Sequence, residues 1–171
     1  MLISNLLYYP DKRLRLNSKK IKIFGEKNNY LIKNMLKIMY DNVGIGLAAN
    51  QINVQKQIIV IDISNDHNKP LILINPKFIY KNNLSHNHEG CISIPNYMNS
   101  IPRFKIIIIE AYDQYGKLFR LKASNLLSFC IQHEMDHLIG KLIIDYLPFY
   151  KIETIKNKYL KLKKNTIIRS F

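Results

Sequence analysis

The order of hydrophobic and polar positions predicts both helices and strands along this chain of 171 residues. Apolar residues at helical spacing predict a helix over about 26–42. Runs rich in β-branched residues predict four strands, over roughly 57–63, 71–75, 105–112 and 117–122. Helices and strands that follow one another in this irregular order indicate an α+β fold.

The C-terminal third is predicted to hold two further helices. Ser124 is a candidate N-cap for the first of them, and Gly140 a candidate stop at its end. The final helix is predicted over about 150–164, after Pro148. We find no internal repeat and no linker, and 47% of the residues are hydrophobic, so 1–171 is predicted to form a single domain with its own core.

The helix after Ser124 carries the sequence QHEMDH, with His133, Glu134 and His137 in H-E-x-x-H spacing. Two histidines four apart lie one helical turn from each other, so both imidazoles can reach one metal ion. Glu134 points about 100° away around the helix, where it can meet a water rather than the metal. This spacing is typical of metal-assisted hydrolysis, with Glu134 as general base. The expected architecture is therefore mixed, mostly antiparallel sheets packed around a central metal-binding helix. The alternative is a helix with two surface histidines.

A catalytic metal of this kind needs a third protein ligand. Ile143 occupies the place of the third histidine in a longer zinc-peptidase pattern and cannot bind a metal. Glu153 is a possible carboxylate ligand, but nothing around it supports that role. Cys130 shares a helical face with the histidines, yet its neighbours are apolar, as is typical of a buried structural thiol. Cys91 remains, in the segment EGCISIP, where glycine and proline indicate a tight, irregular backbone.

A glycine-rich stretch, GIGLAANQ, runs from Gly44 to Gln51. It fits the G-x-G-x-x-A dinucleotide fingerprint, which requires a strand before it and a helix after it. Here the preceding segment has helical spacing and a strand-like run follows, so the order is wrong. The two glycines are better explained as backbone that a substrate can approach closely. Gln51 is a neutral donor that can face a developing oxyanion.

The sequence favours a location in the cytoplasm over a membrane or the secretory pathway. The longest apolar runs have four residues, far too short to span a membrane. The first residues lack a basic region and a cleavage site, so we expect no signal peptide. Two cysteines give no disulfide framework and suit a reducing cytoplasm.

The net charge of +14 is concentrated near the two ends of the chain. Residues 11–22 hold six Lys or Arg against one Asp, and residues 150–171 hold seven against one Glu. Such basic segments indicate an anionic partner, of which RNA is the first candidate in cytoplasm. A solvated surface without a partner is the alternative.

Taken together, GIGLAANQ, EGCISIP and QHEMDH resemble, in order and spacing, the three signature motifs of the peptide deformylase family. The similarity covers nearly the whole chain. The family removes the formyl group from the N-terminal formyl-methionine of new bacterial and organellar polypeptides. The resemblance implies Cys91, His133 and His137 as ligands of one divalent metal. Ferrous iron is the expected native ion, and Zn²⁺, Ni²⁺ or Co²⁺ can replace it. Thiolate and imidazole ligands suit such metals better than Mg²⁺ or Ca²⁺.

The resemblance also implies roles for residues that line the substrate site. Glu134 would move the protons, while Gln51 and the backbone N–H of Ile92 would hold the oxyanion. Five further positions match substrate contacts, and these are Ile45, Gly46, Gly90, Leu126 and Phe129. The expected partners are formyl-methionyl nascent polypeptides and, through the basic C-terminal helix, the ribosome. The protein is expected to be a cytoplasmic monomer.

Three positions depart from the family pattern. Ile92 replaces a common leucine, Met98 stands where many relatives carry an arginine, and Asn87 stands where an apolar pocket residue is frequent. Two other functions compete with deformylation. One is an H-E-x-x-H endopeptidase with an unidentified third ligand, and the other is a basic RNA- or ribosome-binding protein with a structural metal.

Overall fold

The computed structural model describes residues 6–168, and the side chains of residues 6–161. Its α-helices are α1 (Glu26–Asp41), α2 (Asn125–Leu138) and α3 (Phe149–Ile168). Its strands are β1 (Gly46–Ala48), β2 (Ile58–Ile61), β3 (Leu71–Cys91), β4 (Ile94–Tyr112) and β5 (Leu118–Ser124). Three short 3₁₀ helices are η1 (Lys12–Arg15), η2 (Ala49–Ile52) and η3 (Ile143–Tyr146).

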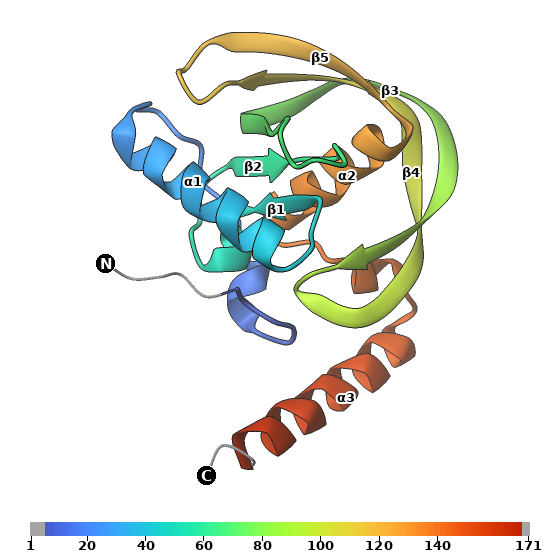
Figure 1. Cartoon of the computed structure of the whole chain (residues 1–171). Coiled ribbons are helices and arrows are strands. Elements are labelled where there is room, and N and C mark those ends of the chain that lie inside the picture. Colours follow the sequence, from blue (N-terminus) through green and yellow to red (C-terminus); the bar gives the residue numbers. More distant parts are fainter. Residues whose placement is uncertain (1–5, 169–171) are drawn as a thin grey trace.

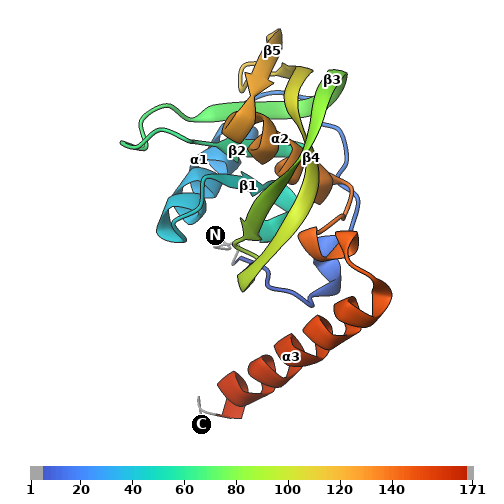
Figure 2. The same cartoon turned by 90° about the vertical axis from the view of Figure 1, so that its right-hand side faces the viewer.

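The five strands form one sheet in the order β1-β2-β3-β4-β5, and every neighbouring pair is antiparallel. A parallel contact occurs as an isolated bridge between Lys19 and Lys56. In Figure 1 the sheet curves around α2, with α1 beside β1 and β2. Figure 2 shows from the side that α3 projects away from these elements. The α+β fold around the motif helix is confirmed, with one antiparallel sheet in place of several mixed ones.

The long β3–β4 hairpin is the main departure from the predicted strand bounds. Strands were predicted over 71–75 and 105–112, but β3 continues to Cys91 and β4 begins at Ile94. The segment with the sequence KNNLSHNHE inside β3 is polar and mostly exposed, so it has little strand signal of its own. Pairing with β4 holds it extended. Cys91 therefore lies at the end of a strand, next to a register shift, rather than in an irregular loop.

Buried side chains attach α2 to the inner face of the sheet. Ile107 and Ile109 of β4 pack with Ile131 of α2, and all three are fully buried. A neighbouring cluster joins Met35 and Met39 of α1 to β1 and β2. The motif helix is thus enclosed on several sides, which fixes the directions of its side chains.

The predicted ends of the motif helix α2 agree with the structure. Ser124 occupies the N-cap position of α2, although its hydroxyl makes no capping hydrogen bond. Gly140 has a φ of +71°, and a Cβ there would collide with the backbone of Arg15. This glycine is required both by its left-handed backbone and by the close approach of a neighbouring segment.

Candidate active site

Cys91, His133 and His137 come together although β3 and α2 are far apart in the sequence. Their sulfur and nitrogen donors all lie within 4.8 Å of one another. Cys91 Sγ lies 3.3 Å from His137 Nε2. The two histidines are one turn apart on α2, with ring centroids separated by 5.0 Å. One thiol and two imidazoles at this separation can hold one metal ion.

A buried chain of charged groups orients His133. Its Nδ1 is 3.0 Å from Oε2 of Glu89, which leaves Nε2 to face the other two donors. Glu89 in turn accepts two hydrogen bonds from Arg103, at 2.9 and 3.0 Å. Arg103 also donates to Asp136 at 2.6 Å. Carboxylate partners of this kind fix the ring and tautomer of a ligating histidine.

The charge state of Glu89 follows from these contacts. Burial alone favours the neutral acid, but the hydrogen bond with His133 and the ion pair with Arg103 outweigh it and lower the pKa of Glu89 to about 2. Sequence reasoning assigned no role to Glu89, Arg103 or Asp136. An arginine within an apolar strand, together with the glutamate that opens EGCISIP, was the available signal.

Glu134 and His137 show that the site fits a metal and its water. Glu134 Oε2 and His137 Nδ1 are buried and have no hydrogen-bond partner within the described chain. Burial lowers the pKa of His137 well below its usual value, so this imidazole is neutral, the form that binds metals. Burial raises the pKa of Glu134 to about 7. A carboxyl group with this pKa can both accept and return a proton near neutral pH.

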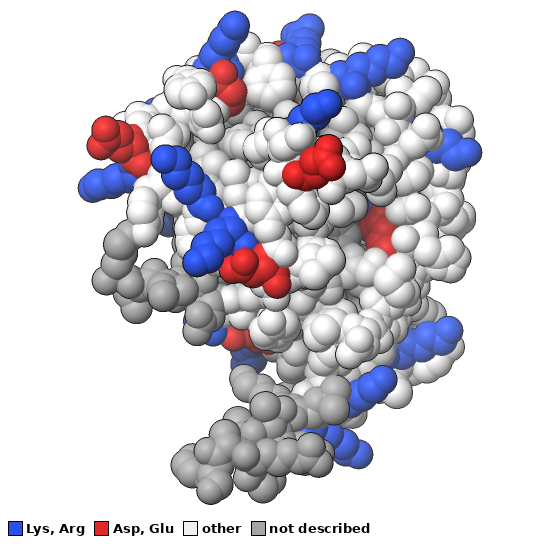
Figure 3. Space-filling view, in the orientation of Figure 1, with Lys and Arg blue, Asp and Glu red and all other residues white. Residues whose placement is uncertain are grey.

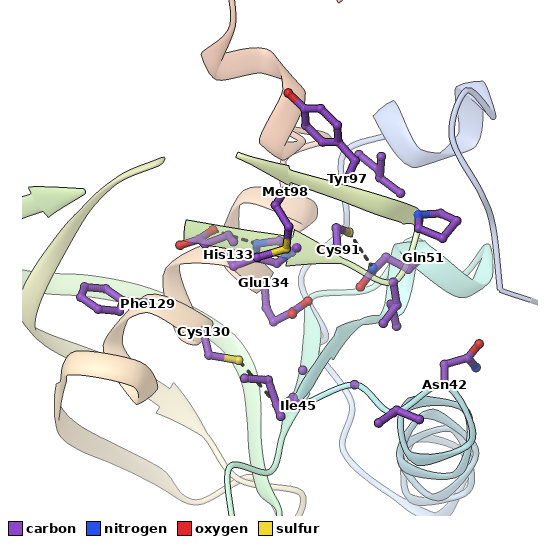
Figure 4. Close-up of a pocket in the computed structure, with 18 of the residues that line it drawn as sticks. Asn42, Ile45, Gln51, Cys91, Tyr97, Met98, Phe129, Cys130, His133 and Glu134 are labelled. Atoms are coloured by element: carbon purple, nitrogen blue, oxygen red, sulfur yellow. Dashed lines mark hydrogen bonds and ion pairs between the residues drawn. The ribbon is translucent and has the colours of Figure 1, made fainter. Parts of the chain in front are cut away.

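Gly46 and Gln51 lie beside these groups. A Cβ on Gly46 would be only 2.5 Å from Oε1 of Glu134, so no larger residue fits there without a shift. Gln51 Oε1 accepts a hydrogen bond from the N–H of Ala48 at 2.8 Å. This turns its Nε2 toward Ser93 Oγ, at 3.1 Å, and toward the sulfur of Cys91 (Figure 4). The amide donor therefore points toward Cys91, one member of the group that could hold a metal.

The predicted substrate residues line one cavity of about 560 Å³ next to these ligands. Its walls include ten of the predicted site residues, namely Ile45, Gly46, Gln51, Gly90, Cys91, Ile92, Leu126, Phe129, His133 and Glu134. His137 lies behind the wall and is 1% exposed. Figure 4 shows the labelled side chains coming from the end of α1, the β1–η2 segment, the hairpin end and α2.

The rival third ligands lie outside the metal group. Glu153 is on α3, where it pairs with Lys156 at 3.2 Å. Cys130 Sγ lies 3.7 Å from the carbonyl of Ile45, and burial raises its pKa well above the usual value. Cys130 is not part of the group of donors that lie within 4.8 Å of one another. The dinucleotide alternative also fails, because α1 precedes the glycine-rich stretch where that motif needs a strand.

The sequence model of the polypeptide deformylase family matches residues 3–153. The chain belongs to this family. A peptide deformylase of Hamiltonella defensa is 48% identical over 164 residues, which cover 96% of each chain. A peptide deformylase of Wigglesworthia glossinidia brevipalpis is 52% identical over 147 residues, covering 86% of this chain and 97% of the relative. The resemblance found in the three motifs is confirmed, and with it the assignment as a hydrolase that removes N-terminal formyl groups.

Solved structures of the family share the fold. The peptide deformylase of Legionella pneumophila has a TM-score of 0.90 and 36% identity, over 97% of this chain and 98% of that one. The Ehrlichia chaffeensis enzyme in complex with actinonin has a TM-score of 0.88 and 32% identity, over 94% and 98% of the two chains. No helix among residues 6–168 is long and apolar enough to cross a membrane.

Proposed function

We propose that the chain forms one catalytic domain in which Cys91, His133 and His137 hold a single divalent metal for hydrolysis of the formyl amide of formyl-methionyl polypeptides. The observation that carries this is the grouping of the three donors beside Glu134, a buried carboxyl group without a partner. A divalent metal bound there supplies Lewis-acid activation of the water and of the formyl carbonyl.

Protein groups carry out the proton transfers and stabilise the negative charge that develops on the substrate. Glu134 takes a proton from the attacking water and returns one to the departing amine, which its position and raised pKa support. Gln51 Nε2 and the backbone N–H of Ile92 donate to the oxygen of the former carbonyl as it becomes negative. One such donor lowers the barrier by about 3 kcal/mol in comparable sites.

The edge of β1 and the end of the hairpin suit an extended peptide. β1 is the first strand of the sheet and pairs with β2 on one side, where the carbonyl of Ile45 accepts a hydrogen bond from the N–H of Asp62. We propose that the N–H of Ile45 and the backbone of Gly46 pair with a substrate strand on the other side. Gly90 lies on the opposite wall of the cavity. We propose that the methionine side chain enters between Leu126, Phe129 and the ring of His133, all of which line the cavity.

The chemistry of the three proposed ligands limits which metal ion the site can bind. One thiolate with two imidazoles suits borderline ions such as Fe²⁺, Zn²⁺, Ni²⁺ and Co²⁺. We propose Fe²⁺ as the working ion. Ferrous iron and the Cys91 thiolate can both be oxidised, so the enzyme should lose activity in air.

Protein purified without oxygen is expected to release formate from formyl-Met-Ala-Ser and to leave unblocked Met-Ala-Ser intact. The activity should decay in air and persist after nickel replaces iron, because nickel is not oxidised under these conditions. Formate release with metal analysis before and after aeration measures both effects. The control is the same preparation after metal removal by a chelator.

Three outcomes of this experiment would count against the proposal. Internal cleavage of unblocked peptides would favour the endopeptidase alternative. Metal retention without any formate release would favour a structural metal site. Full activity after long aeration, with zinc as the bound ion, would show that iron is not the working ion.

We further propose that the protein acts as a cytoplasmic monomer held near the ribosome by α3. The helix spans more than the predicted 150–164, and the side chains of Lys163 and Lys164 lie outside the described residues. Within the described part, Ile152, Ile155 and Tyr159 pack against the domain. The remaining surface of α3 presents exposed lysines toward solvent, which suits RNA phosphates.

Tyr159 also argues against testing α3 by truncation. Its hydroxyl donates to the carbonyl of Pro95 at 2.5 Å, and its ring lies edge-on to Tyr9 at 5.8 Å. Tyr159, Tyr9 and Cys91 belong to one buried cluster. Removal of α3 would therefore disturb the hairpin end that carries a metal ligand, so charge changes on the exposed lysines are the cleaner test.

Reversing the charge at three exposed lysines of α3, as K151E/K158E/K161E, is expected to abolish co-sedimentation with ribosomes at low salt. Turnover of formyl-Met-Ala-Ser should stay within about twofold, because these side chains are exposed and do not line the cavity. Binding of the unaltered protein should weaken steeply as salt rises, since phosphate contacts release counterions.

The matched control reverses three exposed lysines of the β4–β5 hairpin, as K105E/K117E/K122E, with the same change in net charge. That variant should still co-sediment. If both triple variants bind equally well, or lose binding equally, α3 is not the ribosome contact.

A further inference from the structure

The described wall of the cavity carries no lysine or arginine side chain, although the protein is strongly basic. The chain carries 26 Lys and Arg residues, yet the described residues that line the cavity include neither. Its acidic members are Glu89, which is paired with Arg103, and Glu134, which faces the metal group. Figure 3 shows the lysines and arginines spread over this face of the molecule, with uncharged side chains between them. A bound peptide would therefore meet no cation on the cavity wall.

Met98 lines the cavity beside Gly90, one of the proposed substrate contacts. It faces Gly90 across the β3–β4 hairpin. A Cβ on Gly90 would lie 2.8 Å from Met98 Sδ, so the thioether fills the space that a side chain at Gly90 would take. In Figure 4 Met98 extends from the hairpin toward His133 and Glu134. The side chain is nevertheless 61% exposed, so it has room to adapt to a ligand.

The rim opposite Met98 is apolar as well. Val43, Ile45 and Leu126 line the cavity and are large exposed hydrophobic residues. Exposed apolar side chains gathered around one cavity are typical of a surface that is covered in the bound state. A peptide that left the cavity between Met98 and this apolar rim would contact both.

We infer that Met98 is a specificity-determining residue that favours apolar over charged side chains in the two residues after formyl-methionine. This inference rests on the proposed function. The flexible thioether can close over an apolar side chain and remove both from water. A lysine or aspartate at the same place would lose part of its hydration without gaining a partner. The described wall has no Lys or Arg for an aspartate, and its carboxyl groups are engaged, Glu89 with Arg103 and Glu134 beside the metal group.

The test compares kcat/KM on two peptide sets, formyl-Met-X-Ser and formyl-Met-Ala-X, with Leu, Lys or Asp at X. The unaltered protein should prefer Leu over both Lys and Asp at one or both positions, by on the order of fivefold. Met98→Leu should keep that preference. Met98→Arg should lose it and raise kcat/KM for Asp, because the wall then carries a cation. The ionic strength is held at a physiological value, where long-range attraction by the basic surface is largely screened.

Tyr115→Arg is the control for net charge, since Tyr115 is 76% exposed in the turn between β4 and β5 and lies outside the cavity. It should retain the preference for Leu. Equal rates for Leu, Lys and Asp in the unaltered protein would overturn the inference while formate release would still support the proposed function. The same profile in Met98→Arg as in the unaltered protein, or the same shift in Tyr115→Arg, would also overturn it. A lack of formate from every peptide would instead contradict the proposed function.

Discussion

Glu134→Gln is expected to keep its metal and to lose turnover of formyl peptides by about 10²- to 10⁴-fold, the usual contribution of a general base. Glutamine has nearly the same shape, so the contact of residue 134 with Gly46 and the three ligands beside it are preserved. The amide cannot take a proton from water. Metal analysis and kcat/KM on formyl-Met-Ala-Ser separate the two effects.

Glu153→Gln supplies a matched control for this variant. Glu153 is a partly exposed carboxylate on α3 that pairs with Lys156, and a surface pair of this kind contributes at most about 1 kcal/mol to stability. Its activity should be unchanged. An active Glu134→Gln enzyme would show that another group moves the proton, and loss of metal from it would show that Glu134 supports the ligand group instead.

The helix that carries the site was predictable because its signals are local. Two histidines four apart must lie on one face of any helix, and both the helix and its end at Gly140 could be identified from short sequence patterns. The structure adds the orientation of His133, which depends on Glu89 and Arg103. Those two residues are 14 positions apart, on different strands, and no pattern of either strand alone indicates that they meet.

The hairpin that carries Cys91 shows where prediction from sequence was limited. Its outer part is rich in asparagine and histidine, residues with weak strand preference, and it is extended because two long strands pair with each other. Such pairing is a tertiary contact. The three motifs identified Cys91 without knowledge of this strand pairing. Only the structure shows that Gly90 and Met98 lie opposite each other at the hairpin end.

The two cysteines provide the sharpest test of the ligand set, because the same substitution at each should have opposite effects on the metal. Cys91 and Cys130 are 9% and 7% exposed, so replacement by alanine removes a similar amount of buried sulfur at each position. Either variant should lose about 1 kcal/mol of stability from packing. Differences in metal content between them then report coordination rather than packing.

Cys91→Ala is expected to lose most of its metal and nearly all activity. Loss of a residue that only supports a ligand lowers metal affinity by about 10- to 100-fold, and loss of the ligand itself should exceed that. Cys130→Ala should keep its metal, since the Cys130 thiol lies outside the donor group and contacts the carbonyl of Ile45. Metal content and unfolding temperature of the two variants, each with and without added metal, decide the matter. Added metal should raise the unfolding temperature of Cys130→Ala far more than that of Cys91→Ala, because a ligand that binds only the folded state stabilises it. If Cys130→Ala is the variant without metal, the third ligand comes from α2 and Cys91 is a packing residue of the hairpin end.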